Sequence, residues 1–526
     1  MQALNGRSLP GPSIPTLPMQ QASMPSCRPT VFKAVFAVIS LQIPQLKIVK
    51  YLSDDDHRME RKIYAELMGW KNDPDRKPMI LLGCRQVGKT FIVREFGDRE
   101  YGSTVYLNFA DNPDDRLLFR GNLDADRLAD RIIVSKNLPA EGRTLLVLDE
   151  IQECDDAYYS LKPLSSKGRF DIIATGSFLG VTLESGKKDD SGQDEHRVSP
   201  MGYACVKRMY PMDFEEFLWA MGVNRSLISD VKKSVTDGTE IDQYYHRTLS
   251  ELFRRYLVVG GMPAAVKAYS ETGDYAETVK RLDEIVAILR IDAGKYSPKS
   301  DVMRIQACLQ SIPSQLAGGN RSFQYYDIEK KKGTGKREYG TALEWLENAG
   351  IALRCRNLLS VDPPLDNNVD GDAFKMYLCD TGILMSLCGY RDVQEIVAGD
   401  PFTNNGMLME NATADALASK GYPLYYYAKK DSTLEVDFVL KYKGKVCIAE
   451  IKSGKHKRSR SLSMLLSEKN RNRMGLKVCD NNVMTDVNGV MHLPLYGPSF
   501  LEGPEVPRIA RVDVDEINRR YSAGKA

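Results

Sequence analysis

The segment that most limits how this chain can fold runs from Gly83 to Thr90 and reads GCRQVGKT, which fits the pattern G-x-x-x-x-G-K-[ST]. The apolar run Met79 to Leu82 precedes it. Such a short, continuous run predicts a strand that is buried on both faces of a parallel sheet. The segment from Thr90 to Phe96 has helical spacing. Glycines in the intervening turn allow backbone N–H groups and a helix N-terminus to point at phosphate oxygens, so we predict a nucleotide-binding loop.

A strand that ends in two acids supplies the second half of such a site. The apolar run Leu145 to Leu148 is followed by Asp149 and Glu150. We expect Asp149 to hold Mg²⁺ through water, together with the hydroxyl of Thr90. Glu150 is expected to orient and polarise the water that attacks the γ-phosphate. The alternatives are a glycine-rich turn that fits the pattern by chance and a solvated pair of acids, and the strand and helix patterns around the motif favour the site.

A third apolar run, Phe170 to Thr175, ends at Gly176 and Ser177, where a hydroxyl is placed to sense the γ-phosphate. In open α/β sheets, polar residues at the carboxyl ends of neighbouring strands form one ligand crevice. The sequence contains no Asn-Lys-x-Asp motif for reading guanine, which favours ATP over GTP. The predicted nucleotide-binding residues are Gly83, Cys84, Arg85, Gln86, Val87, Gly88, Lys89, Thr90 and Asp149. The predicted catalytic residues of this site are Lys89, which would reach the β- and γ-phosphates, Glu150 and Ser177.

The composition favours a multidomain protein with reduced thiols. A chain of 526 residues predicts three or four domains. A net charge of only +2 does not single out a nucleic-acid or membrane partner. Ten cysteines without a C-x-x-C pair and five dispersed histidines disfavour a zinc site and favour a cytoplasmic protein. The longest apolar stretch, Ala34 to Ile43, covers about half a bilayer, so we expect no membrane span.

The middle of the chain combines helical patterns with a basic turn. Helical patterns after Tyr210 continue to about residue 296 and suit a lid over the nucleotide. Residues 300–360 then follow the order helix, turn, helix and strand, with a basic run from Lys330 to Arg337. This order resembles a winged helix-turn-helix, which either contacts nucleic-acid phosphates or only connects domains. Four arginines that could reach a γ-phosphate are left unassigned: Arg208, Arg254, Arg255 and Arg290.

A helix and three strands near the C-terminus carry a second constellation. Glu450 and Lys452 are two residues apart on one predicted strand, and Asp437 lies on the neighbouring strand of a hairpin. Two carboxylates on one sheet face could hold Mg²⁺, and a lysine could steady the attacking water, as a metal-dependent phosphodiesterase requires. Glu410, on the preceding predicted helix, could add a ligand. The predicted metal ligands are therefore Asp437, Glu450 and Glu410, with Lys452 as a catalytic residue. The alternative is a β-meander with a polar, solvated face.

The ordered motifs together resemble a family of AAA-type ATPases of bacteria and archaea with a C-terminal restriction-endonuclease-like domain of unknown function. The resemblance spans about 59–497. Its most specific motifs are GCRQVGKT at 83–90, LDEIQ at 148–152, TGS at 175–177, YPMDFEEF at 210–217, KMYLCDTG at 375–382, EVDF at 435–438 and EIK at 450–452. Cys84 lies where the family usually has a small residue or proline.

The resemblance implies an α/β fold: a P-loop NTPase of AAA type with a parallel sheet and a helical lid, a winged-helix middle, and a PD-(D/E)xK-like α/β domain at the end. The domains expected are a disordered leader or misplaced start before Met59 (1–58), a P-loop ATPase domain (59–210), a helical lid (211–299), a winged-helix-like domain (300–365), a restriction-endonuclease-like domain (366–500) and a tail (501–526).

Two functions remain open at this stage. The first is an enzyme that hydrolyses ATP with Mg²⁺ to remodel a partner, coupled to a nuclease-like domain that engages nucleic acid. The second is a nucleotide-dependent conformational switch whose C-terminal domain is a catalytically inactive protein-binding module. Glu150 favours the first, because a switch does not need a water-activating acid. The oligomeric state is left open.

Overall fold

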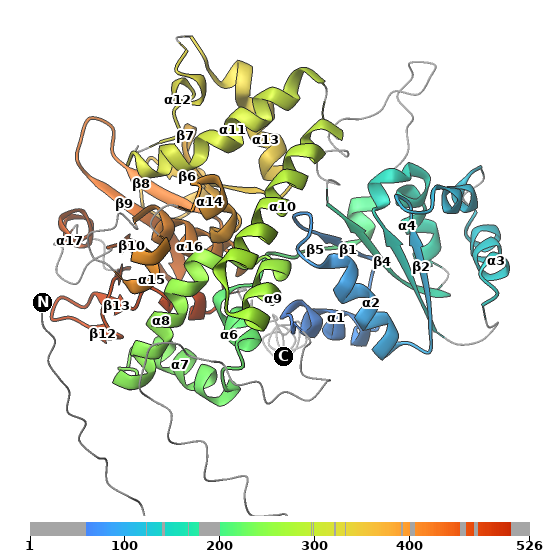
Figure 1. Ribbon diagram of the computed structural model, residues 1–526, viewed down its shortest axis with the longest axis horizontal. Coiled ribbons are helices and arrows are strands. Elements are labelled where there is room, and N and C mark those ends of the chain that lie inside the picture. The colour runs from blue at the N-terminus through green and yellow to red at the C-terminus, as the bar shows by residue number, and fades with distance from the viewer. Residues whose placement is uncertain are drawn as a thin grey trace, which may run out of the picture. The chain divides into compact units, whose positions relative to one another are not determined.

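The computed structural model describes residues 59–121, 124–138, 143–166, 168–177, 200–295, 297, 299–319, 322–331, 333–390, 393–399, 406–452, 459–467 and 472–505 (Figure 1). All of them belong to one compact unit. The leader at 1–58, and residues 506–526 of the expected tail, lie outside the described residues. Within the described part of the chain, no helix has the length and apolar character needed to cross a membrane.

The first sheet is parallel throughout, with the strand order β2-β3-β4-β1-β5. Its strands are β1 (Met79–Leu82), β2 (Ser103–Asn108), β3 (Thr144–Asp149), β4 (Phe170–Gly176) and β5 (Cys205–Arg208). The predicted strands at 79–82, 145–148 and 170–175 are confirmed as β1, β3 and β4. Because β4 lies between β1 and β3, the residue after Gly176 comes next to the loop that follows Leu82.

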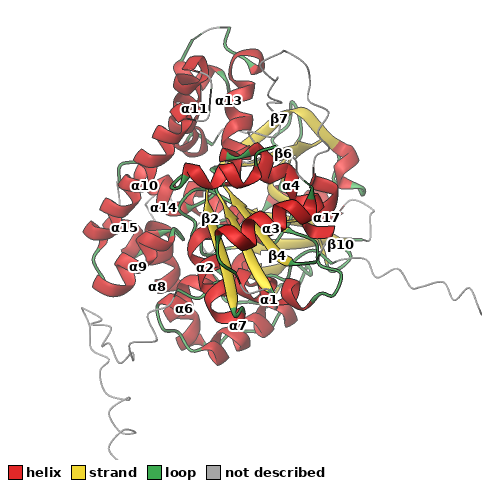
Figure 2. Ribbon diagram, turned by 90° about the vertical axis from the view of Figure 1, so that its right-hand side faces the viewer, coloured by secondary structure: helices red, strands yellow, loops and turns green. Residues whose placement is uncertain are grey.

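Successive residues of these strands face two different cores. Ile80 and Leu146 pack into one core, whereas Leu81 and Leu145 pack into the other. Every residue of β3 and β4 is buried, as expected for strands covered on both faces. The covering helices are α1 (Ile63–Asn72) and α2 (Lys89–Glu100) on one face, and α3 (Ala125–Ser135) and α4 (Asp155–Ser166) on the other. Figure 2 shows the strands among these helices.

A run of helices follows the first sheet, as predicted. The helices are α6 (Phe214–Ala220), α7 (Arg225–Asp237), α8 (Gln243–Val259), α9 (Pro263–Thr272) and α10 (Tyr275–Lys295). Helix α6 begins with a capping box: Asp213 accepts from the backbone N–H of Glu216 at 2.9 Å, and Glu216 accepts from that of Asp213 at 3.1 Å. Gly261, between α8 and α9, approaches Met212 so closely that a Cβ would lie 1.9 Å from the Met212 carbonyl oxygen.

The second sheet contains eight strands in the order β12-β13-β11-β10-β9-β8-β6-β7. The strands are β6 (Ala352–Leu358), β7 (Val369–Leu378), β8 (Tyr425–Ala428), β9 (Glu435–Tyr442), β10 (Lys445–Ile451), β11 (Arg473–Val478), β12 (Met484–Thr485) and β13 (Met491–Leu493). The helices of this part are α11 (Lys299–Ala317), α12 (Tyr326–Glu329), α13 (Lys336–Asn348), α14 (Thr381–Leu387), α15 (Val393–Ala398), α16 (Gly406–Ser419) and α17 (Arg460–Ser467).

The boundary expected at residue 365 lies between two paired strands. β6 pairs with β7 in an antiparallel hairpin and with β8 in parallel, so residues on both sides of 365 share one sheet. The order of α11, α13 and this hairpin is the order expected for a winged helix. Because the hairpin continues into a larger sheet, however, a separate winged-helix domain is not confirmed.

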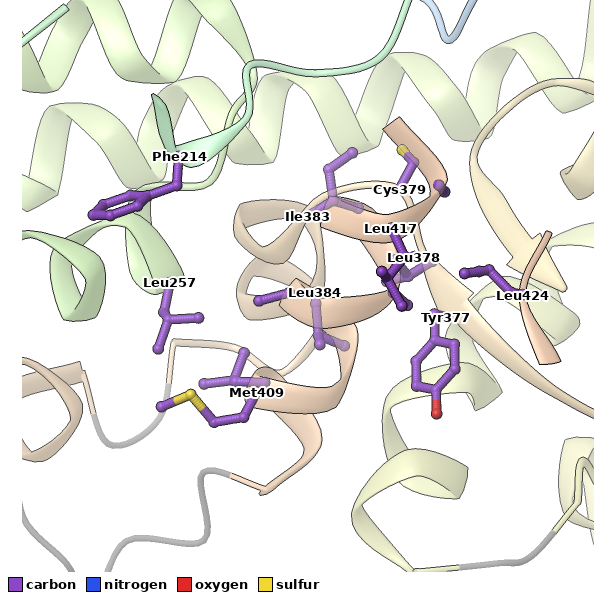
Figure 3. Packing of buried hydrophobic residues seen from close by; sticks show 14 of the residues in the cluster. Phe214, Leu257, Tyr377, Leu378, Cys379, Ile383, Leu384, Met409, Leu417 and Leu424 are labelled. Carbon is purple, nitrogen blue, oxygen red and sulfur yellow. The ribbon is translucent and has the colours of Figure 1, made fainter. Parts of the chain in front are cut away.

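One hydrophobic core extends from the helical region into the second sheet. Figure 3 shows Phe214 and Leu257 of the helical region in the same cluster as Tyr377, Leu384 and Met409. All five side chains are at most 5% exposed. A shared core of this kind stabilises the regions together, because separating them would expose apolar surface to water.

Candidate nucleotide-binding site

At two positions in the loop between β1 and α2, the backbone tolerates only glycine. A Cβ on Gly83 would lie 2.3 Å from the carbonyl oxygen of Met209. Gly88, the last residue before α2, has a φ of 97°, in the region that favours glycine. The loop ends at the N-terminus of α2, where the first backbone N–H groups have no partner within the helix. Such a helix start binds anions, phosphate among them.

Lys89 lies inside this loop. Its ammonium donates to the carbonyl oxygens of Gly83 at 2.9 Å and Cys84 at 3.0 Å. It also donates to the hydroxyl of Ser177 at 2.8 Å. The Lys89 side chain is buried, which lowers its pKa, although the negative charge of Glu150 opposes this. The predicted residues Lys89 and Ser177 therefore meet, and an ammonium that is already shielded from water lies among acceptors that phosphate oxygens could replace.

Asp149 lies at the end of β3 and is 1% exposed. Its carboxylate accepts a hydrogen bond from Thr90 Oγ1 at 2.9 Å. It also accepts from the hydroxyls of Thr175 and Tyr106. Burial and the Asp149 charge raise the pKa of Tyr106 to about 12, so this phenol remains a donor. Thr90 and Asp149 present adjacent oxygen atoms, which are the ligands that Mg²⁺ prefers.

Glu150 follows Asp149 in a left-handed backbone conformation, with a φ of 52°. Its Oε2 accepts from Gln152 Nε2 at 2.5 Å. The side chain is only partly buried, so water can reach it. An acid held in this way, one residue beyond the buried Asp149, has the position expected of a group that activates water.

Three residues around the two acids were not predicted as site residues: Tyr106, Gln152 and Thr175. Thr175 and Gln152 lie within motifs that carry the family resemblance, but the sequence does not show which residues they contact. Along β2, the partly buried Tyr106 lies between two buried residues. Its position in the strand therefore indicates which face of the sheet it lies on, but not that it contacts Asp149.

Three of the four unassigned arginines have partners away from the loop. Arg254 donates to the Val397 carbonyl at 3.3 Å, and Arg255 donates to the Tyr269 hydroxyl at 3.3 Å. Arg290 donates to Gln310 at 2.8 Å. Arg208 is the last residue of β5, which pairs with β1 beside the loop. Its guanidinium group lies near Gly350, since a Cβ added to that glycine would be 3.5 Å from Arg208 Nη1.

Two loop residues connect the candidate site to the rest of the chain. Arg85 forms an ion pair with Asp292 of α10 at 2.5 Å. Burial raises the pKa of Asp292, and Arg85 opposes that shift. The thiol of Cys84 is hydrogen-bonded to that of Cys379, which lowers the pKa of Cys84. Cys84 is part of the core that contains the second sheet, so its side chain packs as a buried apolar group.

The residues of the second constellation contact other protein groups. Glu450 pairs with Lys452 at 2.6 Å, whereas Asp437 accepts from the backbone N–H of Ile451 at 2.7 Å. Among the described residues, no three His, Cys, Asp or Glu side chains are grouped so that they could hold a metal ion. The charges of Glu410 and Lys452 nevertheless act on Asp437, so these groups lie close together, and the assignment of Asp437, Glu450 and Glu410 as metal ligands stays a prediction.

Lys375 of β7 is a further cation close to these carboxylates. Its ammonium lies 3.0 Å from Glu435 and 3.8 Å from Glu410. The charges of Glu410, Asp437 and Glu435 raise the pKa of Lys375 although burial opposes them, so it stays protonated. Burial, followed by the charge of Glu410, raises the pKa of Asp437 to about 7, and Lys375 opposes this shift. Lys375 thus compensates part of the negative charge of Glu410, Glu435 and Asp437.

Strand alternation could not predict this arrangement. The pairing of β8 with β9 shifts by one residue between the pairs Tyr427 with Val436 and Tyr425 with Val439. Asp437 lies in that irregular stretch, where alternation no longer fixes the side of a residue.

We expect Lys375→Met to lower the free energy of unfolding by about 1–3 kcal/mol at pH 8, because it leaves three partly buried carboxylates without their cation. The loss should be smaller at pH 5. A carboxyl whose pKa is raised to about 7 when folded is stabilised by protonation as the pH falls, so Asp437 can then lose its charge. Urea unfolding of the full chain at the two pH values measures this.

The matched control for that variant is Lys445→Met on β10, where the lysine is exposed. It should change stability by less than about 0.5 kcal/mol at either pH. An equal loss for Lys375→Met at pH 5 and pH 8 would show that the ammonium does not compensate Asp437.

Comparisons with known proteins agree with the first site and are silent on the second. Residues 75–218 match a family described as an AAA domain. Residues 250–394 and 405–496 match two families described only as domains of unknown function, DUF8612 and DUF4143. No curated protein matches the chain.

Two solved structures are similar to the chain at low sequence identity. One is the ORC1 protein of Aeropyrum pernix in complex with DNA, at 13% identity over 68% of this chain and 94% of that chain, with a TM-score of 0.25. The other is a signal transduction ATPase with numerous domains and a tetratricopeptide repeat sensor from Pyrococcus horikoshii, at 13% identity over 68% of this chain and 48% of that chain, with a TM-score of 0.23.

The AAA match covers the loop, both acids and Ser177, which supports a P-loop ATPase domain in this chain. The restriction-endonuclease-like fold expected for the C-terminal region is not shown by these matches.

Proposed function

We propose that the chain binds ATP with Mg²⁺ between the loop 83–90 and the acids Asp149 and Glu150, and hydrolyses it. One observation carries the proposal: Lys89 lies 2.8 Å from the hydroxyl of Ser177, and Thr90 lies 2.9 Å from Asp149, at one end of a parallel sheet. These are the groups that P-loop enzymes use for phosphates and Mg²⁺.

Each residue would have a distinct task. Lys89 would exchange its bonds to loop carbonyls for bonds to the β- and γ-phosphates. Ser177, next to that ammonium, would contact the γ-phosphate. Glu150 would accept a proton from the attacking water and orient it in line with the leaving oxygen. Thr90 and Asp149 would hold Mg²⁺, which would neutralise charge on the phosphates.

A fluorescence titration of the full chain with an N-methylanthraniloyl derivative of ATP tests the binding half of this proposal. We expect saturable binding that depends on Mg²⁺ and is displaced by ATP more effectively than by GTP. No saturable binding with millimolar Mg²⁺ present would refute the proposal.

A nucleotide-dependent switch is the second candidate, favoured by the contacts of the loop itself. The ion pair of Arg85 with Asp292 and the burial of Cys84 join the loop to the helical region and the second sheet. Movement of the loop on binding ATP would therefore disturb these contacts. A protein that binds ATP and changes its protease-sensitivity pattern, but releases no phosphate, would be a switch and not an ATPase.

We do not extend the proposal to metal-dependent cleavage of nucleic acid. Two of the predicted ligands already have a lysine partner: Glu410 lies 3.8 Å from Lys375, and Glu450 lies 2.6 Å from Lys452.

A further inference from the structure

Arg61, two residues before α1, connects three segments that are distant in the sequence. It is 7% exposed. Its Nη1 donates to the Val87 carbonyl at 2.8 Å, within the loop that we propose binds phosphate. Its Nη2 donates to the Tyr210 carbonyl at 2.6 Å, and its Nε pairs with Glu216 of α6 at 3.2 Å. All three nitrogens of the guanidinium group are therefore in use.

The bond to Val87 also fixes the direction of its neighbour. In a trans peptide the C=O and the following N–H point in opposite directions. When Arg61 holds the Val87 carbonyl, the N–H of Gly88 must point to the opposite side of that peptide. Gly88 has a φ of 97° and directly precedes α2, so this N–H belongs to the set that phosphate-binding loops offer to their ligand.

Glu216 is itself held in place, which gives Arg61 a fixed support. Its Oε1 accepts from the backbone N–H of Lys62 at 2.6 Å, and its Oε2 accepts from that of Asp213 at 3.1 Å. The guanidinium group is thus held from outside the loop, by Glu216 at the start of α6 and by the Tyr210 carbonyl.

We propose that Arg61 is a positioning residue for nucleotide binding. By holding the Val87–Gly88 peptide, it aims the Gly88 N–H at a phosphate oxygen, and through Glu216 it ties that orientation to α6. The ligand class is a nucleoside di- or triphosphate, since a contact of the loop backbone does not depend on the γ-phosphate. This inference rests on the proposed function.

The test compares Arg61→Met with a control from the same sheet domain. Arg76 pairs with Asp171 at 2.8 Å, and their side chains are 11% and 6% exposed. Asp171 lies near the start of β4, at the opposite end of that strand from Ser177. Arg76→Met therefore removes a partly buried arginine that lies away from the loop. It shows how much the loss of an ion pair changes nucleotide affinity when the loop is not involved.

We expect Arg61→Met to weaken both ATP and ADP, with Mg²⁺, by about 10- to 100-fold, as the loss of a hydrogen bond to a charged group predicts. Arg76→Met should lower the melting temperature without changing either affinity. Glu216→Gln, which keeps the shape of the side chain and one of its two acceptor oxygens but removes the charge that pairs with Arg61, serves as a second variant if Arg61→Met does not fold, and it should weaken both nucleotides to a smaller extent. The readout is competition against the same fluorescent nucleotide, with melting temperatures measured in parallel.

The outcomes separate this inference from the function on which it rests. If the wild-type chain binds no nucleotide, the proposed function fails and the inference fails with it. If the wild type binds, but Arg61→Met and Glu216→Gln bind as tightly as Arg76→Met, the function stands and the positioning role of Arg61 is refuted.

Discussion

Glu150→Gln is expected to slow ATP hydrolysis by about 10²- to 10⁴-fold, the range for loss of a general base, while ATP binds as tightly as before. Glutamine keeps the shape of the side chain and its contact with Gln152 but cannot accept a proton from water. The phosphate-binding groups, Lys89 among them, are unchanged. Single-turnover phosphate release measures the rate, and nucleotide competition measures the affinity.

The matched control for that variant is Glu153→Gln. Glu153 lies on the turn that follows Glu150 and pairs with Arg116 at 3.3 Å and Lys295 at 2.8 Å. Its replacement removes one nearby negative charge without removing an acid that faces the phosphates, so hydrolysis should be nearly unchanged. Normal turnover in Glu150→Gln would show that another group activates the water.

Lys89→Ala is expected to abolish measurable ATP binding. Each hydrogen bond from a charged donor contributes about 1.5–3 kcal/mol, and this ammonium is expected to serve two phosphates at once. Its loss should therefore weaken ATP by more than about 100-fold. Equilibrium dialysis with radiolabelled ATP covers the weak range that fluorescence misses.

Ser177→Ala provides the comparison for Lys89→Ala. It removes the hydroxyl that lies 2.8 Å from the ammonium but leaves the positive charge. A loss of about tenfold or less is expected, the effect of one hydrogen bond. If Lys89→Ala binds ATP as well as Ser177→Ala does, the phosphates are not held by this loop.

The first sheet could be predicted where hydrophobic pattern and motif agree. Continuous apolar runs such as Met79 to Leu82 indicate strands covered on both faces, and β1, β3 and β4 are confirmed. The strands β2 and β5 were missed because exposed or partly exposed residues alternate along them, as Val206 and Lys207 illustrate. A strand of four residues with such a pattern cannot be distinguished from a loop.

The residues that complete each site come from segments distant in the sequence. Arg61 lies 26 positions before the Val87 that it contacts. Lys375 lies 60 positions before its partner Glu435. Periodicity places a side chain on a face of its own helix or strand, but it does not show which other element lies opposite. For this reason the loop and its two acids were predictable, whereas the ammonium among the C-terminal carboxylates was not.

Steady-state release of phosphate from ATP by the full wild-type chain, with Mg²⁺ and with or without double-stranded DNA, tests the central claim most directly. We predict turnover that saturates with ATP, stops when EDTA removes Mg²⁺, and is absent from Lys89→Ala prepared in the same way. Stimulation by DNA would indicate that nucleic acid is a partner. Its absence would not affect the proposal that the chain hydrolyses ATP. Release that is no greater for the wild type than for Lys89→Ala, with or without DNA, would contradict the claim that this site hydrolyses ATP.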